Sequence, residues 1–136
     1  MNIMEYLEER FGIGKENFSD FNIYLGKKEK CYLGPKNVIE KPEIISPGML
    51  MARSLKPTTN LLQMFGHKAT KNLITLSKEQ AVSYVKGEDL RIGNPGADDG
   101  YVIVKYGDYV LGCGFLKGEL LSNNIPKAKR LEVKYL

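Results

Sequence analysis

The sequence of 136 residues has few of the side chains that build metal centres. It contains one histidine, His67, two cysteines, Cys31 and Cys113, and no tryptophan. Neither a Cys-x-x-Cys nor a His-Glu-x-x-His spacing occurs, whereas a structural zinc site usually takes four Cys or His ligands. The inventory argues against a zinc site, and we expect no metal and no cofactor.

Membrane spans and phosphate-binding loops are also missing from the sequence. No stretch approaches the roughly 20 apolar residues that a spanning helix needs. The glycine-rich segment 93–96 is followed by neither Lys-Ser nor Lys-Thr, which argues against a nucleotide-hydrolysing or dinucleotide-binding enzyme. His67 has no nucleophile near it in sequence, and Asp98 and Asp99 sit among turn formers. We therefore expect no catalytic residue and no membrane partner.

The two cysteines lie far apart, each inside an apolar run and without a signal peptide before them. This placement favours two buried thiols in a reducing compartment, with a disulfide as the alternative. We accordingly expect a cytoplasmic protein.

Acidic residues are absent from two long segments, although the net charge is only +4. Residues 44–78 contain five Lys or Arg and no Asp or Glu, and residues 120–131 contain three more basic residues and again no acid. Such asymmetry is typical of a surface for polyanions. The alternative is a solvated basic face without a partner, and charge alone does not decide between them.

The strongest structural signal is the segment 100–116, in which two apolar runs meet at Gly107-Asp108. Tyr, Val and Ile favour strands, and a Gly-Asp pair between such runs supplies the positive φ of a tight hairpin turn. The first run is continuous enough to predict a strand covered on both faces, as in a small barrel. Gly112 and Gly114 point to one face and would let the strand bend or let a backbone or ligand approach.

Turn and capping residues divide the rest of the chain into short elements. The sequence predicts an α+β protein with a small α+β domain over residues 1–70 and a mixed β-barrel over residues 71–136. Helices are expected from Asn2 to Gly12, from Pro57 to Gly66 and from Ser77 to Gly87; strands are expected at 21–25, 30–33, 49–54, 73–76, 90–92, 119–122 and 130–135.

The second half resembles the PUA domain, named for pseudouridine synthases and archaeosine transglycosylases. The resemblance covers residues 71–136 and rests on the order of a Leu-Ile-Thr-Leu strand at 73–76, Tyr-Val-Lys-Gly-Glu at 84–88, Gly-Tyr-Val-Ile-Val at 100–104 and Leu-Gly-Cys-Gly at 111–114. An Asn-x-x-Pro-Lys-x-x-Arg ending at 123–130 is similar to the PUA-like region appended to Sun-type RNA 5-methylcytosine methyltransferases. The first half is similar in size and order to the pre-PUA domain of ribosome-biogenesis factors.

This resemblance implies a mixed β-barrel that binds structured RNA, such as tRNA or rRNA, without catalysing a reaction. A Sun-type catalytic domain would require cysteines in Pro-Cys contexts, which neither Cys31 nor Cys113 has. The implied roles are RNA modification or ribosome biogenesis, with an RNA methyltransferase or a ribosome-assembly factor as partner. The alternative is a protein-interaction subunit that docks onto a separate RNA-modifying enzyme, a hypothesis that the methionines Met49, Met51 and Met64 keep open.

Two groups of residues are predicted to contact RNA. PUA domains are similar in using the segment after the first helix and a late strand, which here implies Lys86, Gly87 and Arg91 together with Lys127, Lys129 and Arg130. Gly87 would allow close backbone approach, or would simply end the helix. The first acid-free segment adds Arg53, Lys68 and Lys71.

Overall fold

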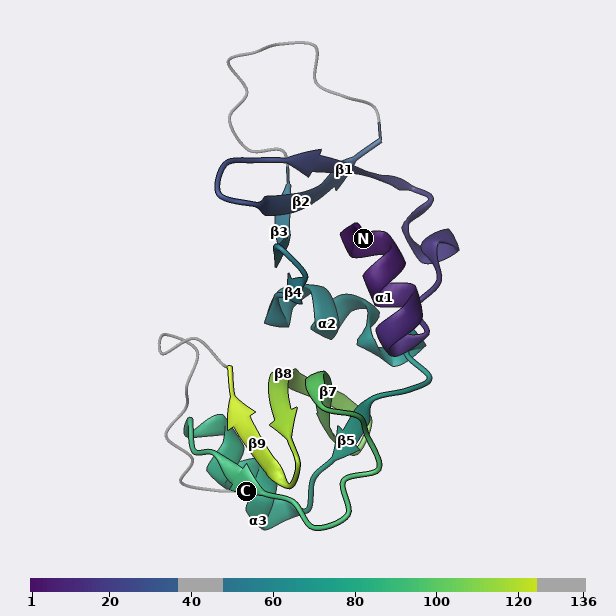
Figure 1. Ribbon diagram of the computed structural model, residues 1–136. Helices are drawn as coiled ribbons and strands as arrows, with labels where there is room; N and C mark the ends of the chain where they lie inside the picture. The colour runs from purple at the N-terminus through teal and green to yellow at the C-terminus, as the bar shows by residue number, and fades with distance from the viewer. Residues whose placement is uncertain (37–47, 125–136) are drawn as a thin grey trace.

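The part of the chain that the structure describes contains two sheets and three short α-helices (Figure 1). The computed structural model describes residues 1–36 and 48–124. The first sheet has the order β1-β2-β3-β4 and consists of Phe21–Leu25, Lys30–Pro35, Met49–Arg53 and Lys56–Pro57. The second has the order β5-β7-β8-β9-β6 and consists of Leu73–Thr75, Gly100–Tyr106, Tyr109–Lys117, Leu120–Asn123 and Leu90–Arg91. The predicted α+β class is confirmed.

The helices are α1 (Ile3–Phe11), α2 (Thr59–Phe65) and α3 (Lys78–Val85), and each begins at a side-chain cap. The Asn2 side chain accepts a hydrogen bond from the Glu5 backbone amide at 2.9 Å. Ser77 and Gln80 form the predicted capping box, since each side chain accepts a bond from the backbone amide of the other residue, at 3.2 and 2.9 Å. These caps satisfy amides that a helix start leaves without partners.

The start of the second helix differs from the prediction. Lys56 and Pro57 form the short strand β4 against Ala52 and Arg53, and α2 starts at Thr59 with Thr58 as its N-cap. Proline is tolerated here because β4 is an edge strand, where a missing amide leaves no partner unsatisfied. The strand predicted at 130–135 lies outside the described residues.

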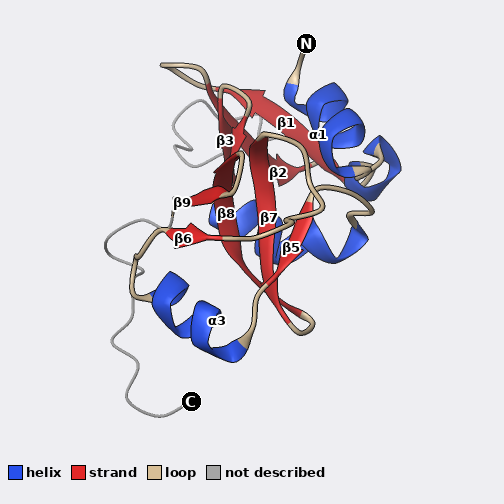
Figure 2. Cartoon of the chain, turned by 60° about the horizontal axis from the view of Figure 1, so that its bottom comes forward, coloured by secondary structure: helices blue, strands red, loops and turns tan. Residues whose placement is uncertain are grey.

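The β7–β8 hairpin turns at Gly107, whose φ of +56° is the predicted left-handed conformation. Val102, Ile103 and Val104 are completely buried, so both faces of β7 are covered as expected. The register shifts after Val104, which leaves Leu111 without a residue opposite it. Such a bulge bends the strand, and Figure 2 shows the second sheet curling, with α3 beside it.

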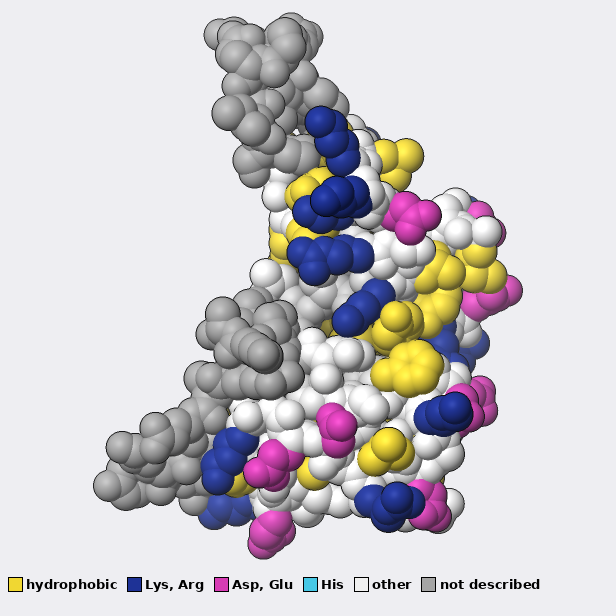
Figure 3. Space-filling model, turned by 60° about the vertical axis from the view of Figure 1, so that its left-hand side comes forward, with side chains coloured by type: hydrophobic (Ala, Val, Ile, Leu, Met, Phe, Trp, Pro, Cys, Tyr) yellow, Lys and Arg dark blue, Asp and Glu magenta, His cyan; other side chains and the backbone are white. Residues whose placement is uncertain are grey.

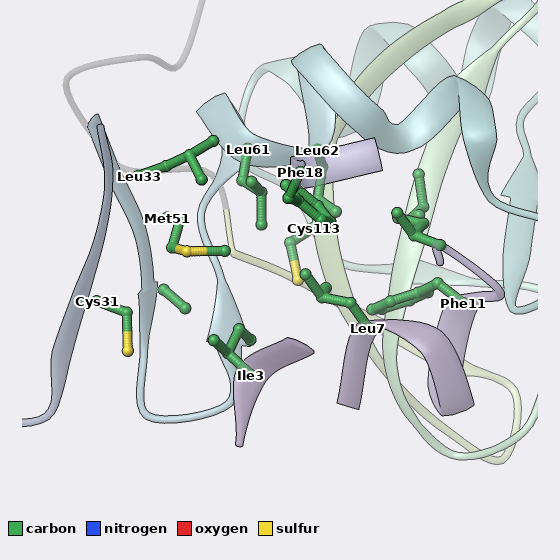
Figure 4. Packing of buried hydrophobic residues seen from close by; sticks show 13 residues of the cluster. Ile3, Leu7, Phe11, Phe18, Cys31, Leu33, Met51, Leu61, Leu62 and Cys113 are labelled. Atoms are coloured by element: carbon green, nitrogen blue, oxygen red, sulfur yellow. The ribbon is translucent and has the colours of Figure 1, made fainter. Parts of the chain in front are cut away.

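Alternate residues of β7 belong to two different hydrophobic clusters. Val102 and Val104 pack with Tyr84 and other residues of the second half. Ile103, on the opposite face, joins a cluster that is built mostly by the first half (Figure 4). That cluster comprises Ile3, Leu7, Phe11, Ile13, Phe18, Cys31, Leu33, Met51, Ala52, Leu61, Leu62, Ile103 and Cys113. The first cluster therefore contains residues of both halves, so hydrophobic packing crosses the boundary predicted at residue 70.

Polar contacts of Arg10 join the halves at a second place, which we call the Arg10 junction. The guanidinium of Arg10 in α1 donates to the carbonyls of Tyr101 and Asp98, at 2.7 and 2.6 Å. Asn72 completes the junction because its side chain donates to the Arg10 carbonyl and accepts from the Asp98 amide, at 2.6 and 2.9 Å. Helix α1 is thereby bonded to the start of β7 and to the segment that precedes it.

Both cysteines are buried free thiols, as predicted. In the part of the chain that the structure describes, no helix has the length and apolar character to cross a membrane.

Alkaline conditions are expected to destabilise the protein through Cys113. Burial raises the pKa of its thiol from 9.0 to about 12, although the charges of Lys56 and Arg10 lower it. Between these pH values the unfolded chain releases a proton that the folded chain retains, so stability falls as the pH rises through this window. Urea unfolding at pH 8, 9.5 and 11 should show a smaller loss for Cys113→Ala than for the wild type. Equal losses in the two proteins would contradict this assignment.

Candidate nucleic-acid interface

The first candidate surface lies where α3 ends and leads into β6. Lys86 is the C-cap of α3, and Gly87 follows it with a φ of +99°. The Gly87 amide donates to the Tyr84 carbonyl at 2.9 Å and the Glu88 amide donates to the Ser83 carbonyl at 3.1 Å. Gly87 therefore ends the helix, as one of its two predicted roles requires. The other role, a backbone contact with RNA, stays a prediction.

Acidic side chains are interleaved with the basic ones at this surface. Arg91 faces Glu119 at 4.0 Å, and both side chains are largely exposed, so their attraction is screened by water. Asp89 has a structural role because its carboxylate accepts a hydrogen bond from the backbone amide of Asn123 at 2.8 Å. This bond holds the loop against β9. Lys86, the other basic residue predicted to contact RNA at this surface, is exposed.

The second candidate surface is a line of three cations across the first sheet. Lys30 of β2 lies directly opposite Arg53 of β3, and Arg53 lies directly opposite Lys56 of β4. Directly opposite residues of antiparallel strands project from the same face. We call these three residues the basic row.

The basic row and a line of buried residues occupy opposite faces of the first sheet. The next position along each strand holds Cys31, Ala52 and Pro57, which also lie opposite one another and are all buried. Since successive side chains of a strand alternate between faces, the buried line and the basic row lie on opposite sides of the sheet. Figure 3 shows Lys and Arg side chains gathering over the upper part of the molecule, where Figure 1 places this sheet.

No acid neutralises the basic row among residues 1–36 and 48–124, where the Arg91–Glu119 contact is the one ion pair. Neighbouring strands are about 4.8 Å apart, so the three charges occupy about 10 Å of surface. A small recess of about 120 Å³ adjoins the row and is lined by Arg53, Lys56, Pro57, Thr58, Thr59 and Asn124. This arrangement offers several hydrogen-bond donors and uncompensated positive charge to an anion.

Comparison with known families decides what the second half is. Residues 71–131 match the family model described as the Methyltransferase RsmF PUA domain. This region is a PUA domain. The match confirms the resemblance found in the sequence, and the curled second sheet fits the expected PUA-like barrel. No curated protein matches the chain.

PUA domains bind RNA, so the chain carries an RNA-binding domain. Within the described ranges, no three His, Cys, Asp or Glu side chains come together in a way that could hold a metal ion.

The predicted contact residues fall into separate parts of the structure. Lys86, Gly87 and Arg91 come together at the α3–β6 end of the PUA domain. Lys68, at the end of a short 3-10 helix, and Lys71, the first residue of the matched region, are both exposed. The Thr70 amide between them donates to the Phe11 carbonyl at 2.8 Å. Arg53 lies in the basic row. Lys127, Lys129 and Arg130 lie outside the described residues.

Two residues of the basic row were not among the predicted contacts. Lys56 belongs to the acid-free segment that pointed to Arg53, whereas Lys30 follows Glu29 directly and so stands outside any acid-free run. Only the pairing of β2, β3 and β4 brings the three together. The apolar run at 30–33 predicted the strand β2, but no local signal specified which residue of β3 Lys30 would face.

Proposed function

We propose that the protein is a non-catalytic RNA-binding protein that recognises structured RNA, either tRNA or rRNA, and assists RNA modification or ribosome assembly in the cytoplasm. The PUA domain over residues 71–131 is the observation that carries the proposal. A separate RNA methyltransferase or a ribosome-assembly factor would supply the chemistry or the assembly step. The two free buried thiols support a reducing compartment.

Recognition would rest on the RNA backbone and on its shape. Lys and Arg side chains neutralise phosphates and position a protein on nucleic acid without reading its sequence. The exposed Lys68, Lys71 and Lys86 suit this role because long flexible cations reach phosphates from a surface.

Binding to bulk tRNA should weaken steeply as salt is added. If about four phosphates are neutralised, the logarithm of the association constant falls with the logarithm of salt concentration at a slope of about −3. Affinity would then drop by about 60-fold between 50 and 200 mM KCl. Filter binding or fluorescence anisotropy measures this dependence. Binding that ignores salt, or no binding to tRNA or rRNA, would rule out the proposal.

Neutralising the α3–β6 end should weaken that binding without unfolding the protein. The double variant Lys86→Gln/Arg91→Gln is expected to lose about tenfold in affinity, because each substitution removes a phosphate contact. The magnitude of the salt slope should decrease as well. Lys15→Gln/Lys78→Gln, at two other exposed positions, removes the same charge and serves as the control. Equal affinities for the two variants would show that the RNA contact does not lie at the α3–β6 end.

A second candidate function is supported by an apolar pocket beside α1. The pocket has a volume of about 630 Å³ and lies between the start of α1 and the β1–β2 hairpin. Leu25 and Met1, which line it, are 83% and 66% exposed. This surface suits a subunit that docks onto a separate RNA-modifying enzyme. Of the three methionines named for that hypothesis, Met51 is fully buried and Met49 packs against the core, whereas Met64 is 49% exposed.

Ribonuclease treatment separates the two candidate functions. A partner that stays bound to the tagged protein after ribonuclease treatment, and is lost from Leu25→Ser, would favour docking through the pocket. Release of all partners by ribonuclease would favour RNA tethering.

A further inference from the structure

We infer that the basic row is a second contact surface for the RNA backbone, outside the PUA domain, and that one RNA molecule contacts both sheets. This inference rests on the proposed RNA-binding function and extends it to the first half of the chain. The ligand is the sugar-phosphate backbone, recognised by charge and by hydrogen-bond donors.

The folded state holds the three cations in an arrangement that is unfavourable without an anion. Like charges that lie directly opposite on neighbouring strands repel one another and destabilise the sheet. Here the repulsion occurs twice, between Lys30 and Arg53 and between Arg53 and Lys56. Lys30 and Lys56 are half-buried while Arg53 is exposed, so the aliphatic stems can pack along the sheet while the charged heads reach water. A phosphate chain along the row would relieve both repulsions.

Backbone contacts hold the row in place before any ligand arrives. The chain reverses between Arg53 and Lys56 through Ser54, which adopts a φ of +54°. The Ser54 amide donates to the Glu29 carbonyl at 2.8 Å, so the turn is tied to the preceding hairpin. The Thr58 hydroxyl donates to the Leu50 carbonyl at 2.8 Å and fixes the exit from β4. A rigid backbone under the cations lowers the ordering cost of binding.

The recess beside the row connects this surface to the PUA domain. Arg53, Lys56, Thr58 and Thr59 come from the first half, whereas Asn124 follows β9 of the PUA sheet directly. Lys56 is also near enough to β8 for its charge to lower the pKa of the Cys113 thiol, against the larger effect of burial. An RNA strand on the row would therefore lie next to the PUA sheet.

The test is tRNA binding by the full chain after neutralisation of the row. The triple variant Lys30→Gln/Arg53→Gln/Lys56→Gln should bind bulk tRNA about 30-fold more weakly at 100 mM KCl, and the salt slope should decrease in magnitude by about 2. The control Lys15→Gln/Lys78→Gln/Lys117→Gln removes three charges at exposed positions elsewhere. It should lose no more than about threefold, with an unchanged slope.

The outcomes separate this inference from the proposed function. If the wild-type chain does not bind tRNA or rRNA, the proposed function fails. If the wild type binds with salt dependence and the row variant matches its control, the inference is overturned and the proposed function stands. The single variant Arg53→Gln, at an exposed position, repeats the test should the triple variant not fold; its slope should change by about 1. An unchanged slope there would also overturn the inference.

Discussion

Replacing Phe11 with alanine is expected to destabilise the chain by about 3–5 kcal/mol, the range for removing a buried aromatic side chain. Phe11 is completely buried at the end of α1. It belongs to the cluster that also contains Ile103 and Cys113 of the PUA sheet. The cavity left by Phe11→Ala would thus lie in a core that both halves build, and we expect the PUA domain to lose stability together with α1.

Urea unfolding combined with amide hydrogen exchange measures this effect in both halves. In Phe11→Ala, the amides of β7 and β8 should lose protection in parallel with those of α1. Phe115→Ala is a suitable control, since Phe115 is 39% exposed and its ring makes an edge-on contact with Tyr101, with centroids 5.3 Å apart. That variant should lose about 1 kcal/mol. If β7 and β8 instead keep wild-type protection in Phe11→Ala, the halves unfold separately and the boundary predicted at residue 70 divides two independent units.

Adding a side chain at Gly114 is expected to have the second large effect. An added Cβ atom would lie 2.6 Å from Leu121 Cδ1, 3.1 Å from Val104 Cγ2 and 3.3 Å from the Ser122 carbonyl oxygen. Leu121 and Val104 are completely buried and cannot swing into solvent. Gly114→Val should therefore destabilise the protein by about 2–3 kcal/mol, as overpacking of a filled core does.

Gly93→Ala provides the matched control for Gly114→Val. A Cβ at position 93 would meet no atom within 4 Å. The free energy of unfolding of this variant should therefore lie within about 0.5 kcal/mol of the wild-type value. Thermal unfolding followed by circular dichroism compares the two variants. A Gly114→Val protein as stable as Gly93→Ala would mean that β8 and β9 separate at little cost at this position, contrary to the close packing around Gly114.

The elements that the sequence predicted well are those determined by neighbours in the chain. Asn2 and Ser77 cap helices through contacts only three residues away. Gly107 closes a two-residue turn between runs whose alternate faces are both apolar. Such signals are local, so composition and spacing are enough to locate the elements.

The features that the sequence did not predict depend on pairing between distant segments. The basic row requires the register of three strands, and a shift of one residue would have placed each cation on the core face. The acid-free segment 44–78 includes Arg53 but not Lys30, whose neighbour Glu29 carries a negative charge. The Arg10 junction likewise joins residues about 90 positions apart, and no local pattern marks Arg10 as different from other helix-end cations.

The Arg10 junction also limits what the protein can adapt to. Arg10 bonds α1 to Asp98, which precedes β7, at 2.6 Å and to Tyr101 within β7 at 2.7 Å. The first cluster also takes residues from both sheets, so these contacts restrain the two sheets relative to each other. If one RNA contacts both sheets, as inferred above, its phosphates would have to lie at distances that match the separation of the two surfaces. Selection among RNAs would then follow from their three-dimensional outline, with no base read directly.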